Sequence, residues 1–173
     1  MRKLIFVAVG LSLVAAAAFA QGAPRKGAFG MQTAVIITTV TGSPAGSLGA
    51  KYMITDAIGV RAGLGILEMS GGGTSSTSFD LGAGFEYHFP GKGGVSPYLG
   101  AELGYSGVSV SGGGATPSDF GLNAVFGAEF FLSSNFSWGG EALLGFNSGT
   151  SGGVTTTTIG TGAVAFDLTW YLN

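Results

Sequence analysis

The chain has 173 residues without a single cysteine, and only 9 % of them are charged, whereas a soluble domain usually carries about 25 %. The missing cysteines exclude disulfides and thiolate metal sites. The formal net charge is −2 and no stretch is rich in Lys and Arg, which argues against a nucleic-acid partner.

The N-terminus has the pattern of a secretory signal peptide. A positive start at Arg2 and Lys3 precedes an apolar run over residues 4–18, and the small-x-small cleavage pattern Ala-Phe-Ala follows. The alternative is a retained membrane anchor, but the run is short and leads directly into the cleavage pattern. We therefore predict that the mature chain begins at Gln21.

Three segments follow from this: a signal peptide over residues 1–20, a short periplasmic segment over residues 21–27, and one domain over residues 28–173. The mean hydropathy is +0.47, yet beyond the signal peptide no stretch approaches the roughly 20 apolar residues of a transmembrane helix. In lipid only helices and closed barrels satisfy all their own backbone groups. A membrane-spanning β-barrel is the option that remains.

Apolar and small or polar residues alternate with a period of two, which is typical of half-buried strands. The alternation is clearest over residues 58–66, 79–89 and 120–130. Five further segments show it less sharply, and the first of them is apolar on both faces: residues 29–40, 48–54, 99–105, 136–146 and 163–172. We predict an all-β fold, an eight-stranded antiparallel up-and-down transmembrane β-barrel.

One face of these strands is large and apolar, and the other is rich in glycine with a few charges. The lumen of an eight-stranded barrel is only just wide enough for side chains, so it cannot hold the many aromatic residues of the large face. We therefore place Phe85, Phe126 and Leu144 against lipid, and Glu86 and Glu141 in the lumen.

The connections alternate in length, as expected when periplasmic turns are tight and outer loops extend. Residues 55–57, 90–94 and 133–135 are short, and residues 41–47 form a brief outer loop. Longer loops are expected over residues 70–78, 107–118 and 147–155. At Gly107 the alternation changes, which we interpret as a β-bulge that moves Val108 and Val110 to the other face.

Aromatic residues lie near the strand ends on the apolar face, as in the two aromatic girdles of membrane barrels. The residues expected in these girdles are Phe29, Phe79, Tyr87, Phe89, Tyr105, Phe120, Phe130, Phe136, Phe146 and Trp170.

Residues 52–65 and 95–105 resemble repeats of the small outer-membrane β-barrel family, which includes the membrane domain of outer-membrane protein A and its short eight-stranded relatives. The last strand, residues 166–173, is similar in its alternation to the family's C-terminal insertion signal. The resemblance implies an eight-stranded barrel in the bacterial outer membrane, in contact with its lipids and inserted by the outer-membrane assembly machinery. We expect a monomer.

The predicted lumen face carries nine titratable side chains. We expect an ion-pair network centred on Arg61 that largely plugs the lumen; an acidic, water-filled path for cations is the alternative reading. The residues of this hypothetical network are Lys51, Arg61, Asp80, Glu86, His88, Glu102, Glu129, Glu141 and Asp167.

Sites of chemistry are hard to find in the sequence. His88 is the only histidine, and no serine and acid near it form a recognisable nucleophile arrangement. We expect no enzyme activity, no cofactor and no metal. The predicted function is a structural or surface-interaction barrel, with a narrow cation-leaning pore and a soluble secreted β-protein as alternatives.

Overall fold

The computed structural model describes residues 25–38, 44–71, 73–112 and 116–172. The predicted signal peptide, its cleavage site and residues 21–24 lie outside the described residues. In the described part of the chain, no helix has the length and apolarity needed to cross a bilayer.

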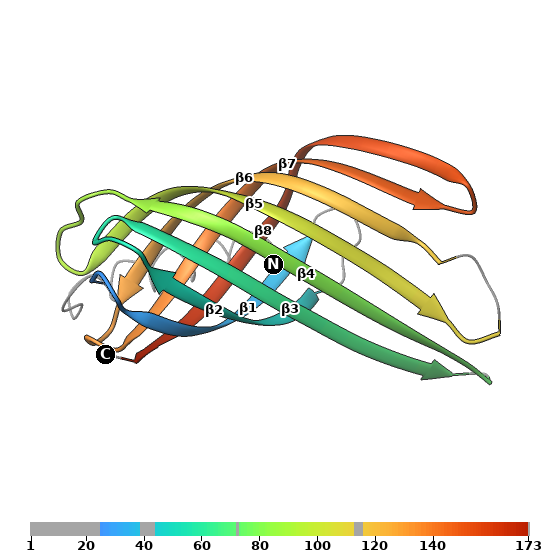
Figure 1. Cartoon of the computed structure of the whole chain (residues 1–173), viewed down its shortest axis with the longest axis horizontal. Helices are drawn as coiled ribbons and strands as arrows, with labels where there is room; N and C mark the ends of the chain where they lie inside the picture. Colours follow the sequence, from blue (N-terminus) through green and yellow to red (C-terminus); the bar gives the residue numbers. More distant parts are fainter. Residues whose placement is uncertain (1–24, 39–43, 72, 113–115, 173) are drawn as a thin grey trace, which may run out of the picture.

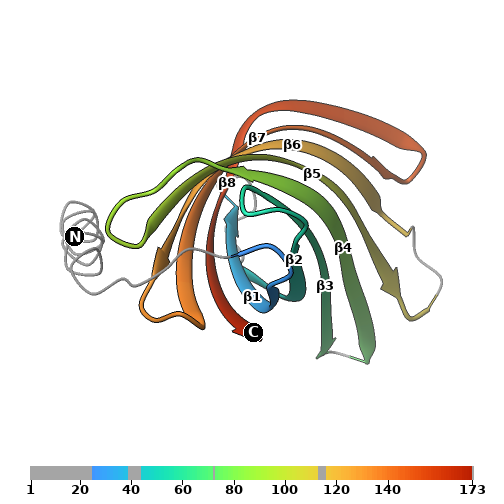
Figure 2. The same cartoon turned by 60° about the vertical axis from the view of Figure 1, so that its left-hand side comes forward.

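The described residues form eight antiparallel strands that close into one barrel (Figure 1). Each strand pairs with the next along the chain, and β8 returns to pair with β1, so the wall has no free edge (Figure 2). The all-β, eight-stranded antiparallel barrel predicted from the sequence is confirmed. The strands are β1 (Phe29–Thr38), β2 (Pro44–Met53), β3 (Ile58–Gly71), β4 (Thr74–His88), β5 (Val95–Val110), β6 (Ser118–Phe131), β7 (Phe136–Ser151) and β8 (Val154–Leu172).

The two faces of the wall have the predicted sidedness. Phe85, Phe126 and Leu144 are 52 %, 50 % and 45 % exposed on the outside, whereas Glu86 and Glu141 are buried inside. The outer surface between the strand ends therefore consists of large apolar side chains, which match the acyl chains of a bilayer. Stacked or tilted aromatic pairs such as Phe130–Trp138 and Phe136–Trp170 lie near one end of this surface.

The lumen also holds a few large side chains. Tyr98, Phe131 and Tyr171 are buried inside, and Met53 packs with the last two. These residues lie at or near the end where the short turns are, so this end of the lumen is filled by side chains rather than by glycine.

We call this end the short-turn end. It carries the connections at residues 54–57, 89–94 and 132–135, and it also holds Phe29 and Leu172, which pair with each other. The backbone N–H of Gly27 donates to Met53 O, which ties the segment before β1 to the end of β2.

The opposite end, which we call the hairpin end, differs from the prediction. The prediction of long loops is wrong for most of residues 70–78 and 147–155, which extend the strands of the β3–β4 and β7–β8 hairpins (Figure 1). In the predicted loop over residues 107–118, residues 107–110 and 118 belong to β5 and β6, and the other described residues connect these strands. Of the brief outer loop predicted over residues 41–47, residues 44–47 belong to β2, and residues 41–43 lie outside the described residues. The β7–β8 turn consists of Gly152 and Gly153 alone, both with positive φ as a type I′ turn requires. The physical reason is that threonine-rich polar segments favour strands once a neighbour satisfies their backbone.

The bulge predicted at Gly107 is absent, because Gly107 pairs with Phe79 on one side and Ser118 on the other in continuous register. Among the described strands, the pairing of β7 with β8 does contain a shift in register, which lies between Leu143 and Leu144. Without a bulge, Val108 and Val110 point to the lumen side of β5. The polarity of the two faces therefore changes along the strand while its backbone stays regular.

Two arginine substitutions on the outward face of β4 test whether this face contacts lipid. Ala83 lies within the apolar surface of β4, and Thr77 lies on the same face nearer the hairpin end. We expect Ala83→Arg to lower the free energy of unfolding by about 2–4 kcal/mol and Thr77→Arg by about 0–1 kcal/mol. Denaturant titration in lipid vesicles measures both, and equal costs would contradict the assignment.

Candidate functional site

Arg61 on β3 lies among three carboxylates inside the barrel. Its Nη2 atom donates to Glu102 Oε2 at 2.7 Å and to Glu141 Oε2 at 3.1 Å. Its Nη1 atom donates to Glu86 Oε1 at 3.2 Å and also to Glu141 Oε1. Glu141 thus accepts from both nitrogens, which is the bidentate geometry of strong and directional Arg–carboxylate pairs.

Lys51 on β2 forms a second centre. Its Nζ atom lies 2.6 Å from Glu86 Oε2 and 3.0 Å from Glu129 Oε2, and its side chain is buried. Since Glu86 also contacts Arg61, this carboxylate joins the two centres. Charges taken out of water persist only when they are paired, and both cations meet that condition.

Two of these ion pairs cross the full width of the barrel. In a closed ring of eight strands, each strand lies opposite the strand four positions further on. Lys51–Glu129 joins β2 to β6, and Arg61–Glu141 joins β3 to β7. Both pairs therefore connect opposite walls of the barrel.

Hydroxyl groups fill remaining acceptor positions of two carboxylates. Tyr98 Oη donates to Glu141 Oε1 at 2.5 Å. Tyr171 Oη and Ser137 Oγ donate to Glu129 Oε1 at 2.7 Å and 2.5 Å. Gly127 makes this arrangement possible, because a Cβ there would lie 2.4 Å from the Tyr98 ring.

His88 is placed between a carboxylate and a hydroxyl group. Its Nε2 atom is 2.9 Å from Glu86 Oε2, and its Nδ1 atom is 2.8 Å from Ser96 Oγ. These two contacts account for both ring nitrogens. Glu86, His88 and Ser96 thus follow one another in the order of carboxylate, base and hydroxyl found in hydrolase nucleophile arrangements. The prediction that no serine and acid near His88 form such an arrangement is therefore wrong in its geometry, because the antiparallel pairing of β4 with β5 brings Ser96 to the imidazole. All three side chains are buried.

We call these connected side chains the lumen network. Its members come from β2 to β8 and are Lys51, Arg61, Glu86, His88, Ser96, Tyr98, Glu102, Glu129, Ser137, Glu141 and Tyr171. The structure thus brings together seven of the nine side chains that the sequence suggested.

The other two suggested residues, Asp80 and Asp167, form no ion pair within the described residues. Asp167 on β8 is buried, and its Oδ2 atom has no hydrogen-bond partner among them. Asp80 on β4 shares the lumen face but is exposed towards the hairpin end. Likewise, the described residues contain no group of three or more His, Asp or Glu side chains arranged to hold a metal ion.

The sequence model of the outer membrane protein beta-barrel domain matches residues 6–165. The chain belongs to this family. Membership places the chain in the bacterial outer membrane and agrees with the apolar outer surface. No curated protein matches the chain in sequence.

Solved structures of two outer-membrane barrels have a similar fold. The N-terminal barrel domain of Pseudomonas aeruginosa OprF is 14 % identical, with a TM-score of 0.54 over 86 % of this chain and 100 % of that one. The outer membrane protein OprG from Pseudomonas aeruginosa is 12 % identical, with a TM-score of 0.52 over 87 % of this chain and 98 % of that one. Both are similar in fold, and identities this low carry no information about activity.

Four polar members of the lumen network of this outer-membrane barrel were not predicted: Tyr98, Tyr171, Ser96 and Ser137. The alternation alone contains the signal for all of them, because each sits between residues of the lipid-facing set. The predicted network was restricted to Asp, Glu, Lys, Arg and His side chains, and this left out all four hydroxyl groups.

Replacement of one buried cation tests how much stability is lost when carboxylates of the lumen network are left without their partner. Lys51→Met leaves Glu86 and Glu129 without their shared ammonium group, and uncompensated buried charge typically costs about 3–5 kcal/mol. Lys92→Met, in an exposed turn, is the matched control and should change stability little. Denaturant unfolding in lipid vesicles compares them, and a neutral Lys51→Met variant would contradict the role of the pair.

Proposed function

We propose that this protein is a non-enzymatic outer-membrane barrel with a structural or surface-interaction role, and that the lumen network plugs it against the passage of solutes. The observation that carries the proposal is the pair of ion bridges between opposite walls, Lys51–Glu129 and Arg61–Glu141. An eight-stranded lumen is narrow, so side chains that meet in its centre leave little free section.

The rest of the proposal concerns how the barrel reaches its place. We propose export through a signal peptide over residues 1–20, cleavage before Gln21, and insertion by the outer-membrane assembly machinery as a monomer surrounded by outer-membrane lipids. The short-turn end then faces the periplasm, and the hairpin end faces outward.

A narrow, cation-leaning pore is the second candidate function, and the excess of acids favours it. The lumen holds Glu86, Glu102, Glu129, Glu141 and Asp167 against two cations, Lys51 and Arg61. A conducting path with this lining would prefer cations.

Planar-bilayer conductance separates the plugged barrel from the pore. We expect the native protein, purified in its heat-modifiable folded form, to produce no discrete channels. The paired variant Arg61→Ser with Glu141→Ser removes one cross-lumen bridge without changing the net charge, and we expect it to conduct cations. Discrete channels from the native protein would overturn the plug.

Single cysteines test the orientation, because the chain contains no other cysteine. Ser111→Cys lies at the hairpin end, and Ser134→Cys lies in a turn of the short-turn end. On intact cells, a membrane-impermeant maleimide should label the first and reach the second only after the outer membrane is opened. The reverse pattern would show that the barrel is inserted the other way round.

A further inference from the structure

The extensions of β3 and β5 at the hairpin end have the opposite polarity to the barrel wall below them. On their outward face, β4 and β5 present Thr77, Ser75 and Ser109. On the lumen side, β3, β5, the β5–β6 connection and β8 carry six apolar residues, which we call the apolar rim: Leu67, Met69, Val108, Val110, Pro117 and Val154. In these extensions, apolar side chains thus lie on the lumen side, whereas in the barrel wall below they lie on the outside.

The apolar rim is open in this structure. Met69 is 57 % exposed and Val154 is 68 % exposed. Two hollows adjoin the rim, one of about 440 Å³ beside Met69 and Val110, and one of about 410 Å³ between the β5–β6 and β7–β8 hairpins. Both hollows are open to solvent rather than enclosed, and their volumes fall within the range of small-ligand sites.

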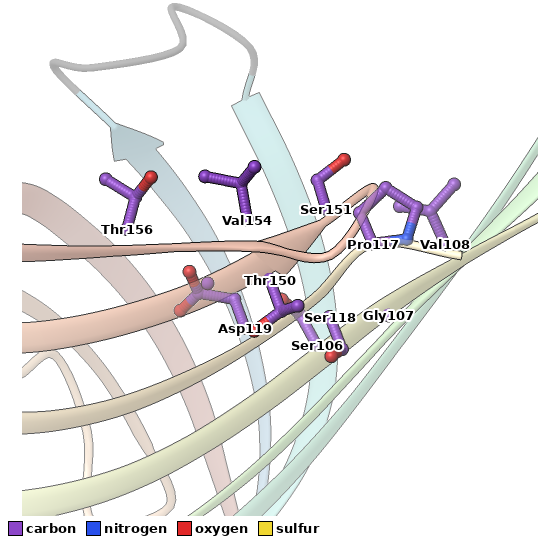
Figure 3. Close-up of a pocket in the computed structure, with 11 residues that line it drawn as sticks. Ser106, Gly107, Val108, Pro117, Ser118, Asp119, Thr150, Ser151, Val154 and Thr156 are labelled. Atoms are coloured by element: carbon purple, nitrogen blue, oxygen red, sulfur yellow. The ribbon is translucent and has the colours of Figure 1, made fainter. Parts of the chain in front are cut away.

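Carboxylates lie beside and below this rim. Asp80, Ser106 and Asp119 stand side by side on the lumen face of β4, β5 and β6, because Asp80 pairs with Ser106 and Ser106 with Asp119. The two carboxylates are about 10 Å apart across two strand spacings. Asp119 also lines the hollow between the β5–β6 and β7–β8 hairpins, near Thr150 (Figure 3).

A belt of four glycines keeps the space below this row open. Gly63, Gly82, Gly104 and Gly121 are neighbours across β3 to β6. At the first three, an added Cβ would meet no heavy atom closer than 3.7 Å, so close packing is not what requires glycine there. Glu102, which pairs with Arg61, forms the floor of this space, and its side chain is 22 % exposed.

The charge of this region is of one sign. The sequence contains no Lys or Arg between Arg61 and Lys92 and none after Lys92, which lies in a turn of the short-turn end. The extensions therefore carry Asp80, Asp119 and the outward-facing Glu68 without any basic residue. A cation is the complementary partner for such a surface.

We propose that the hairpin end binds a small amphipathic organic cation, with its apolar tail on the apolar rim and its charged group between Asp80 and Asp119. The tail covers exposed apolar surface, and the charged group meets two carboxylates that the chain leaves uncompensated. This site deepens the proposed surface role of the hairpins and rests on it, but it does not depend on the plug.

The probe for the test is hexyltrimethylammonium, added to the full mature chain in phosphatidylcholine nanodiscs and followed by amide chemical shifts. We expect saturable shifts at Ser106, Val108 and Asp119. Tetramethylammonium, which lacks the tail, and hexanesulfonate, which reverses the charge, should both bind at least about fivefold more weakly.

Matched variants separate the site from general surface charge. Asp80→Asn and Asp119→Asn should each weaken binding by about fivefold, the upper range for exposed charge pairs. Glu68→Gln, on the outward face of β3, should leave the affinity unchanged. Val108→Thr should weaken binding of hexyltrimethylammonium but not of tetramethylammonium.

The proposal would be overturned by shifts that do not saturate, by hexanesulfonate binding as tightly as the cation, or by an equal loss of affinity in Glu68→Gln. Shifts that depend on protein concentration without any probe would show instead that a second copy covers the rim, and would also overturn it. If one of these results is obtained and the protein also forms no channels, the proposed ligand site is wrong and the proposed plugged barrel is unaffected.

Discussion

Closure of the sheet by the pairing of β1 with β8 is the constraint on which the rest of this structure depends. It lets every strand satisfy its backbone on both sides, which the interior of a bilayer requires. With only eight strands, closure also fixes a narrow lumen. Large apolar side chains must then lie outside, and the residues inside must be small or must interlock.

The lumen network is how this barrel accommodates charge in that narrow space. Glu86 is shared by Lys51 and Arg61, and hydroxyl groups of Tyr98 and Tyr171 occupy further acceptor positions. Buried ion pairs add little net stability compared with apolar packing, but loss of one partner is costly. The network therefore restricts which side chains can occupy the lumen more than it adds to the stability of the fold.

The sequence predicts the strand number, the closed topology and the sidedness, because a period of two along each strand records which residues face lipid. It predicts that Arg61 and Glu141 face the lumen, but not that they contact each other. The two residues are 80 positions apart in the sequence, and the register between the strands decides whether they lie at the same height. Asp80 shows the same limit: alternation gives its face, while its height above the network depends on how far each strand extends. The sequence does not distinguish the hairpin extensions from loops, because serine, threonine and glycine are common in both.

The two ion bridges across the lumen also have a mechanical consequence. A thin-walled tube under uneven lateral pressure deforms most easily by flattening into an ellipse, which lengthens one diameter and shortens the one at right angles. Lys51–Glu129 and Arg61–Glu141 lie along neighbouring diameters, and both resist stretching. The barrel is therefore stiffer against elongation along these two directions than across them, so membrane tension should distort its cross-section anisotropically.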